Sequence, residues 1–228
     1  MKKNDKMNKK NQDNSNTYGK KEKDKLVKSC LKHAVFDGFS SESLKKACKD
    51  CKIDYANANA LFPNPEKDIQ VHWAIMLDEG TLEYAKKINK SKKVRDKISC
   101  LVKHRIKEID KHKVCAKDVL GQALLPYNTP TFMHQLWDTA DNMWIGIGDK
   151  TPHSDTNYYT KRIILCGVIA SSIMFWVSDK GNEVDEFIDR RIDDALKLGK
   201  IKKPESLKIL KQFSKFMPHI NHPLKMRD

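Results

Sequence analysis

The chain has 228 residues and a formal net charge of +14, enough length for one domain or two small ones and a charge that favours anionic partners. The charge lies at the ends, because nine lysines stand against four acids in residues 1–25 and nine basic residues against two acids in residues 197–228. Six cysteines without an apolar N-terminal segment argue against a disulfide-stapled secreted domain and predict reduced thiols.

The first part of the chain predicts a tail followed by a small helical head. Residues 1–23 are rich in Lys and Asn, hold almost nothing apolar and are expected to be disordered. Three short helices are predicted in residues 24–63: the first ends at Asp37, the second is capped near Ser40, and the third spans about 55–61. Three short helices followed by a long one are typical of a helix-turn-helix head on a helical body.

Helical periodicity continues through a body at residues 64–200 and into a C-terminal segment at 201–228. No stretch alternates with period two for long enough to predict a strand, so the expected fold is all-α with about ten helices. The helices predicted after the head lie near 65–88, 92–111, 114–125, 129–147, 158–179, 183–199 and 204–217.

The most apolar part of the chain is residues 135–176, where a polar aromatic turn joins two predicted helices. The helix over 129–147 is apolar over more than half its circumference, and nearly every residue from Ile163 to Val177 is apolar or small. That run is shorter than the roughly 20 residues that cross a bilayer, so it predicts a helix buried on all sides. The two helices form either a thick core or the walls of an apolar pocket.

Motifs for catalysis and metal binding are missing from the sequence. Cys48 and Cys51 follow Cys30 and His33 at a spacing that zinc could use, but Cys30 and Cys48 fall on apolar helix faces, where a free cysteine behaves as a small hydrophobe. No Glu has a His three positions later, as a helical di-iron site needs, and there is no phosphate-binding glycine loop or nucleophile elbow. We therefore expect no enzyme, no metal and no resident cofactor.

Residues 204–217 predict an amphipathic helix with one apolar and one basic face. Such a helix lies either in a membrane interface, with its lysines toward anionic headgroups, or against its own domain or a dimer mate. The candidate membrane-binding residues are Leu207, Leu210, Phe213, Phe216, Lys208 and Lys211.

The polar aromatic turn also allows two interpretations. Exposed Met, Trp and Tyr beside polar groups are typical of a protein-binding hot spot, whereas the same residues in a core would serve packing alone. The residues concerned are Met143, Trp144, Tyr158, Tyr159 and Arg162.

Several motifs in residues 25–200 together resemble the coenzyme Q biosynthesis "protein nine" family, lipid-binding accessory proteins of ubiquinone synthesis with a TetR-like fold. They include Leu-Pro-Tyr-Asn-Thr-Pro at 125–130, Asp-Asn-Met-Trp at 141–144, Asp-Thr-Asn-Tyr-Tyr-Thr-Lys-Arg at 155–162 and Phe-Ile-Asp-Arg-Arg-Ile at 187–192. The sequence departs from the family where Tyr158 stands for the usual tryptophan, and the loop at 150–154 is longer.

The resemblance implies a non-enzymatic protein that takes an isoprenoid quinone intermediate, or a phospholipid, from a membrane and presents it to the di-iron demethoxyubiquinone hydroxylase. It assigns the aromatic turn to that partner and the terminal helix to the membrane, and it implies a homodimer formed through residues 158–179 and 183–199. The apolar stripe expected to form the dimer interface consists of Phe187, Ile188, Ile192 and Ala195. The candidate lipid-binding residues are Trp137, Ala140, Ile164, Val168 and Phe175.

A TetR-type transcription regulator that binds DNA and a hydrophobic inducer is the alternative. Its recognition segment would be residues 54–61, which contain no basic residue, although Asn57 and Asn59 have side chains that contact adenine. We therefore expect no specific nucleic-acid partner. The many Lys, Asn and Ile residues suggest an AT-rich bacterial genome, and the predicted location is the bacterial cytoplasm, on the inner face of the inner membrane.

Overall fold

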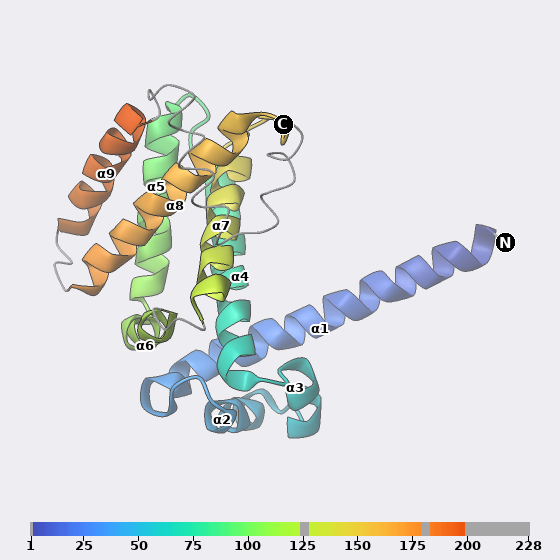
Figure 1. Cartoon of the computed structure of the whole chain (residues 1–228). Helices are drawn as coiled ribbons and strands as arrows, with labels where there is room; N and C mark the ends of the chain where they lie inside the picture. The colour runs from blue at the N-terminus through green and yellow to red at the C-terminus, as the bar shows by residue number, and fades with distance from the viewer. Residues whose placement is uncertain (1, 124–127, 179–182, 199–228) are drawn as a thin grey trace. The chain divides into compact units, whose positions relative to one another are not determined.

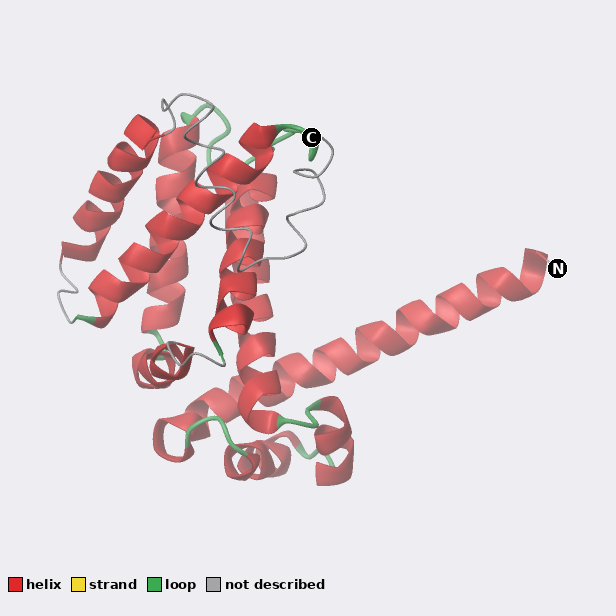
Figure 2. Ribbon diagram, in the orientation of Figure 1, coloured by secondary structure: helices red, strands yellow, loops and turns green. Residues whose placement is uncertain are grey.

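The computed structural model describes the chain except for residues 1, 124–127, 179–182 and 199–228, and describes the backbone alone for residues 2–18, 123 and 198. The described part consists of helices and loops without strands, which confirms the predicted all-α fold (Figures 1 and 2). The predicted helix at 204–217 lies outside the described residues. The helices are α1 (Lys2–Asp37), α2 (Ser41–Cys51), α3 (Tyr55–Leu61), α4 (Pro65–Lys87), α5 (Val94–Asp110), α6 (Lys113–Ala123), α7 (Thr129–Gly146), α8 (Thr156–Val177) and α9 (Val184–Leu198).

The chain divides into two compact units. The first comprises residues 1–76 and 114–119, and the second comprises residues 77–113 and the chain from 120 onward. The division falls inside α4, and the predicted boundary lay before this helix, between residues 63 and 64.

The start of α4 packs with the head, which is why the first unit includes it. Ile69 is fully buried there, and the Trp73 ring lies 5.9 Å from the Phe39 ring. The Nε2 atom of His72 lies 2.7 Å from the Oδ1 atom of Asp24 on α1. Apolar burial and a polar contact therefore join α4 to helices that precede it by dozens of residues.

The head helices begin and end where local sequence signals place them. The Ser40 hydroxyl accepts a hydrogen bond from the Ser43 amide, and the Ser43 hydroxyl accepts one from the Ser40 amide, so α2 starts with a complete capping box. Lys52, with φ of 56°, ends α2 in the left-handed conformation, and the Asp54 carboxylate caps α3. The head core includes Leu26, Val27, Leu31, Ala34, Leu44 and Ala47, which are all buried, whereas Val35 on the same apolar stripe of α1 is 44% exposed.

The first helix is longer than expected. Its backbone is helical from Lys2, where the sequence analysis expects a disordered segment over residues 1–23. Lysine favours helices, and the segment contains no proline to interrupt a helix that the packed residues from Leu26 onward anchor. The prediction rested on the lack of apolar residues, which bears on packing and not on backbone propensity.

The second unit is a bundle in which α8 packs against α7 and α9, and α5 contacts all three. At Gly146, the last residue of α7, an added Cβ would lie 2.9 Å from the Cβ of Ala85 on α4, so only glycine allows this close approach. The core side chains of this unit come from every helix of the bundle and include Leu101, Val102, Ile106, Ala140, Met143, Leu165, Ile169 and Ile188.

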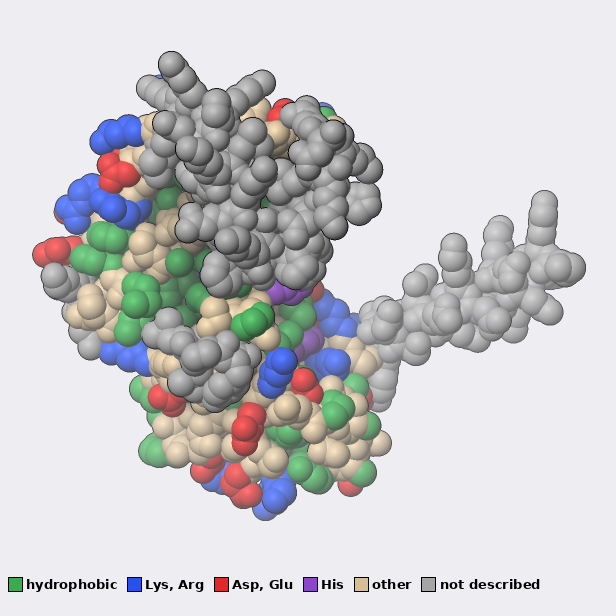
Figure 3. Space-filling view, in the orientation of Figure 1, with side chains coloured by type: hydrophobic (Ala, Val, Ile, Leu, Met, Phe, Trp, Pro, Cys, Tyr) green, Lys and Arg blue, Asp and Glu red, His purple; other side chains and the backbone are tan. Residues whose placement is uncertain are grey.

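The sequence predicts that the helix over residues 163–177 is buried on all sides, and the structure contradicts this for α8. Gly167 is exposed and Met174 is 56% exposed, and Figure 3 shows apolar side chains at the surface over α8 and α9. By length and composition α8 could cross a membrane, and half of its most apolar window is buried inside the protein. It combines a core face with an apolar outer face, which is why its whole circumference is apolar.

A buried ion pair lies within the second unit between α4, α5 and α7. The Arg105 guanidinium donates to Oδ1 of Asp78, and the Thr139 hydroxyl donates to the same oxygen at 2.9 Å. Both residues are 7% exposed. Burial raises the pKa of Asp78 even though Arg105 and Thr139 oppose that shift, and burial lowers the pKa of Arg105.

Candidate functional site: an apolar pocket

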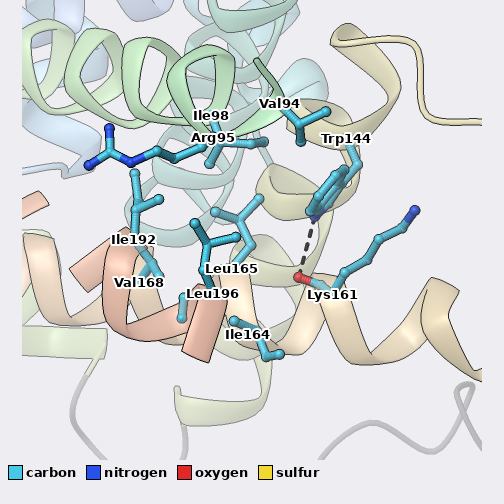
Figure 4. Close-up of a pocket in the computed structure, with 11 residues that line it drawn as sticks. Val94, Arg95, Ile98, Trp144, Lys161, Ile164, Leu165, Val168, Ile192 and Leu196 are labelled. Carbon is cyan, nitrogen blue, oxygen red and sulfur yellow. Dashed lines mark hydrogen bonds between the residues drawn. The ribbon is translucent and has the colours of Figure 1, made fainter. Parts of the chain in front are cut away.

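A pocket of about 390 Å³ lies within the second unit, between α5, α7, α8 and α9 (Figure 4). This volume falls within the range of small-molecule sites. The lining residues are Val94, Arg95, Ile98, Trp144, Lys161, Ile164, Leu165, Val168, Ile192, Ala195 and Leu196.

The charged groups of Arg95 and Lys161, the two charged residues of the lining, contact carboxylates outside the pocket. Arg95 directs its guanidinium to α9, where its Nε atom donates to Oδ1 of Asp193 at 2.7 Å. Lys161 extends away from the aliphatic lining, and its ammonium contacts Asp149 (Figure 4). Both residues therefore present hydrocarbon stems to the pocket, as long basic side chains often do. The surface of this pocket is therefore mainly apolar, and its lining places no side chain for acid–base or nucleophilic chemistry.

Trp144 forms one wall, and the turn between α7 and α8 holds it in place. Its indole Nε1 donates to the backbone oxygen of Lys161 at 3.3 Å, which Figure 4 draws as a dashed line. The Lys161 ammonium lies 4.7 Å from the centre of the indole ring, a cation–π contact. Gly148, with φ of +85°, allows the turn that brings Asp149 to Lys161. The indole is therefore fixed by both edge and face.

Helices α5 and α9, which supply the opposite wall, are joined by a ladder of charges. Because the helices are antiparallel, basic residues at increasing positions of α5 meet acids at decreasing positions of α9. The pairs are Arg95 with Asp193 at 2.7 Å, Lys103 with Asp189 at 2.6 Å, and Lys107 with Asp185 at 3.4 Å. The Ser99 hydroxyl also donates to Asp189 at 2.6 Å. These contacts hold α9 over the pocket.

Acid is expected to weaken this attachment. The hydrogen bond from Arg95 lowers the pKa of Asp193; partial burial would raise the pKa of Asp189, but hydrogen bonds from Lys103 and Ser99 outweigh it and lower that pKa. A carboxylate with a lowered folded-state pKa stabilises the fold above its unfolded pKa of about 3.9 and loses that contribution as pH falls through the folded value. Thermal melts below about pH 4 should therefore depend less on pH in Lys103→Met than in wild type.

Lys45→Met is the matched control for that measurement, since Lys45 is exposed on α2 and pairs with Glu42 on its own helix. Its acid dependence should follow wild type. An unchanged acid slope in Lys103→Met would mean that the ladder contributes nothing to stability.

Two of the five predicted lipid-binding residues line the pocket, Ile164 and Val168. The other three lie outside the lining of this pocket. Ala140 is fully buried in the core, the Trp137 ring lies 6.2 Å from the Tyr159 ring, and the Phe175 ring stacks on Phe187 at 4.1 Å.

The part of the lining that comes from α5 and α9 was not predicted as a lipid site; the α5 residues lie more than 60 positions before those of α8 in the chain. The apolar spacing of Ile192 and Ala195 was recognised but assigned to a dimer interface. In the structure Ile188 and Ile192 are buried within their own chain, where α9 packs on α5 and α8. Phe187 and Ala195 are only half-buried, so packing within one chain covers part of this apolar stripe and leaves part of it accessible.

The predicted partner surface is mostly interior. Met143 is fully buried, Tyr158 is 7% exposed and Arg162 is 2% exposed. Trp144 lines the pocket, and Tyr159 is half-buried. The prediction that these five residues form an exposed hot spot is therefore wrong for three of them, because a hot spot and an aromatic core share one composition.

The buried Arg162 organises the turn between α7 and α8. Its Nε donates to Oδ1 of Asp141 at 2.6 Å, and its Nη1 donates to the backbone oxygen of Tyr158 at 3.1 Å and lies 3.4 Å from Oδ2 of Asp149. Its guanidinium carbon also lies 3.4 Å from the centre of the Tyr158 ring. Burial, followed by the Asp141 carboxylate, raises the pKa of Tyr158 to about 12, so this phenol keeps its proton and donates a hydrogen bond to Oδ1 of Asp141.

The predicted membrane-binding residues at 207–216 lie outside the described residues. Among the residues that are described, no group of three or more His, Cys, Asp or Glu side chains is arranged to hold a metal ion. Cys30 and Cys48 are buried free thiols, and burial is the main cause that raises the pKa of each.

Comparison with known proteins relates the chain to one family. Residues 129–199, which span α7 to α9, match the family model described as COQ9. The chain is 23% identical over 190 residues to ubiquinone biosynthesis protein COQ9-B, mitochondrial, of Xenopus laevis, covering 77% of this chain and 62% of the relative. It is 24% identical over 190 residues to ubiquinone biosynthesis protein COQ9, mitochondrial, of Rattus norvegicus, covering 77% and 59%.

A third relative is the probable ubiquinone biosynthesis protein coq9, mitochondrial, of Dictyostelium discoideum, 22% identical over 188 residues, with 78% of this chain and 61% of the relative covered. The matched part of the chain spans about three fifths of the length of these relatives. The resemblance drawn from the sequence motifs is thus confirmed.

The predicted bacterial cytoplasmic location is wrong, since the relatives are named mitochondrial and come from eukaryotes. The prediction was based on residues that AT-rich codons encode. Base composition does not distinguish bacterial genomes from eukaryotic ones, so it could not carry that conclusion.

Proposed function

We propose, from the similarity to the COQ9 family of ubiquinone biosynthesis and from the pocket, that the chain is a non-enzymatic lipid-binding accessory protein. In this proposal the pocket holds the hydrocarbon tail of an isoprenoid quinone intermediate. The protein takes this lipid from a membrane and presents it to the di-iron demethoxyubiquinone hydroxylase, without making or breaking a bond itself.

The observation that carries the proposal is the lining of the pocket. Its side chains are aliphatic or aromatic, and the charged ends of Arg95 and Lys161 are held by Asp193 and Asp149. A hydrocarbon chain in such a pocket loses contact with water without stripping water from a charge. The walls also come from α7, α8 and α9, the helices that match the family model.

The partner surface and the membrane-binding segment are further parts of this proposal. Tyr159 at the turn and the exposed Ile145 on α7 remain accessible for a partner, whereas Met143, Tyr158 and Arg162 are interior. Residues 204–217 would supply membrane contact through their apolar and basic faces.

A transcription regulator is not favoured. Helix α3 exposes Asn57 and Asn59, but it carries no basic residue, and its N-cap is an acid, Asp54. Phosphate contacts from Lys and Arg supply most of the affinity of a DNA-binding helix. A recognition helix without them lacks the main attraction to DNA.

Mass spectrometry of lipid extracted from the purified full chain tests the proposal. Prenylated quinones or phenols should accompany the wild-type protein, and Ile164→Trp, which fills the pocket, should reduce their amount roughly tenfold or more. Ile145→Trp makes the same change at a position that is 54% exposed and outside the pocket, and it should retain the lipid. Equal lipid in the two variants, or none in wild type, would overturn the proposed role of the pocket.

A further inference from the structure

The loop between α4 and α5 is strongly basic and leads directly to the pocket. Residues 86–95 contain no acid and six basic residues: Lys86, Lys87, Lys90, Lys92, Lys93 and Arg95. Val94 and Arg95, where α5 begins, are the first residues of the pocket lining. A concentration of positive charge therefore adjoins the rim of an apolar site.

Carboxylates neutralise only part of this charge. Lys86 pairs with Glu83 one turn earlier, and Arg95 pairs with Asp193. Lys90 and Lys93 are exposed, and no carboxylate among the described residues lies within ion-pair distance of either. The ammonium of Lys92 donates to the Cys100 sulfur at 3.6 Å, which is a neutral partner. The loop thus keeps a net positive charge at the surface.

Two exposed apolar side chains lie at the rim of the same pocket. Val94 is 52% exposed and Leu196 is 51% exposed, and both line the pocket. The Arg95–Asp193 pair brings the start of α5 next to the last turns of α9, and Figure 1 shows these helix ends on the same side of the second unit. Lysines and exposed aliphatic groups are therefore combined around one pocket.

We propose that a rim surface, defined as Lys90, Lys92, Lys93, Val94 and Leu196, docks on the anionic phospholipid headgroups of a bilayer. The lysines attract the negatively charged surface, and the two apolar side chains enter the boundary between headgroups and acyl chains. The pocket then opens toward the hydrocarbon, so a lipid tail passes between bilayer and protein without crossing water. The inference rests on the proposed function in that the pocket holds a lipid.

The sequence that follows α9 is consistent with this orientation. Helix α9 ends at Leu198, two residues after Leu196, and the sequence continues with Lys200, Lys202 and Lys203 before the amphipathic residues 204–217. A nucleic acid or an acidic protein would also be attracted by the lysines. Neither of these partners accounts for the exposed aliphatic side chains and the apolar pocket beside the lysines, whereas a bilayer accounts for both.

Vesicle binding by the full chain tests the proposal. Wild type should co-sediment with phosphatidylcholine vesicles that contain phosphatidylglycerol and much less with phosphatidylcholine alone, and salt should weaken the binding. The rim variant, in which Lys90, Lys92 and Lys93 are changed together to Gln, should have a partition coefficient about 100-fold lower, since each basic residue near an anionic surface contributes roughly fivefold. Changing Val94 and Leu196 to Ser should slow lipid transfer out of the vesicles.

A matched control keeps the test specific. Changing Lys28, Lys32 and Lys49 to Gln removes the same charge from exposed positions of the head. An equal loss of binding in this control would mean that net charge alone acts and would overturn the proposal. The rim variant could instead bind vesicles as wild type does while changing Lys208, Lys211 and Lys215 to Gln abolishes binding. That result would assign membrane contact to the C-terminal segment alone and would overturn the proposal. A rim variant that lost binding to an oligonucleotide but kept binding to vesicles would also overturn it.

A second measurement separates this inference from the proposed function. A soluble apolar fluorescent probe, added without vesicles, reports on the pocket alone. The rim variant should bind the probe as wild type does, whereas Ile164→Trp should not. If wild type failed to bind the probe, the proposed function would fail, and the vesicle result would still decide whether the rim surface meets membranes.

Discussion

Replacing Met143 by glutamate is expected to unfold the second unit, with a loss of about 4–5 kcal/mol in the free energy of unfolding. Met143 is fully buried on α7, the helix that packs along α8. A glutamate there must either bury a charge without a designed partner or bind a proton to become neutral, and both outcomes cost free energy. Urea denaturation followed by circular dichroism measures the loss.

Ile145→Glu is the control for that experiment. Ile145 lies on the same helix and is 54% exposed, so its glutamate stays in water and should change stability by no more than about 0.5 kcal/mol. Comparable losses for the two variants would contradict the buried position of Met143. A Met143→Glu protein that failed to bind the hydroxylase would report unfolding, so Met143 cannot serve to map a partner surface.

Replacing Arg105 by leucine is expected to cost about 3–5 kcal/mol, because it leaves the Asp78 carboxylate buried without its counter-ion. Asp78 would keep the hydrogen bond from Thr139, but that neutral donor replaces little of the guanidinium charge. Burial raises the pKa of Asp78 even with Arg105 present, and removing Arg105 should raise it further. Thermal and urea denaturation near pH 7 measure the destabilisation.

Arg191→Leu provides the matched control, since Arg191 pairs with Asp194 at an exposed position on α9. Exposed ion pairs contribute about 0–1 kcal/mol, so this variant should remain close to wild type. Replacing Asp78 and Arg105 together by leucine should recover part of the loss, because no charge then remains buried. A double variant less stable than Arg105→Leu would show that the loss comes from packing and not from the unpaired carboxylate.

The sequence by itself determined the all-α class and the bounds of most helices. The predicted helices near 65–88 and 129–147 correspond to α4 (Pro65–Lys87) and α7 (Thr129–Gly146), and the predicted third helix has the observed bounds of α3. Local interactions explain this agreement: the capping box at Ser40 and the left-handed Lys52 act within a few residues of the helix ends that they define.

Apolar spacing also identified the helices that build the pocket, but not which faces line it. Ile164 and Val168 were predicted and line it, while Ile192 was placed in a dimer interface and Val94 was not singled out. A helix with an apolar face must bury that face, and its spacing does not say whether the cover is another helix, a second chain or a ligand.

Only the tertiary structure decided which aromatic and charged side chains are interior. Met143, Tyr158 and Arg162 have the composition of an exposed hot spot, yet they are buried where α7 and α8 meet, with Asp141 and Asp149 neutralising the arginine. The pairing of Arg95 with Asp193 joins residues 98 positions apart and closes one wall of the pocket. Contacts of that range depend on how the helices pack, because no local propensity or spacing encodes which distant partner a side chain meets.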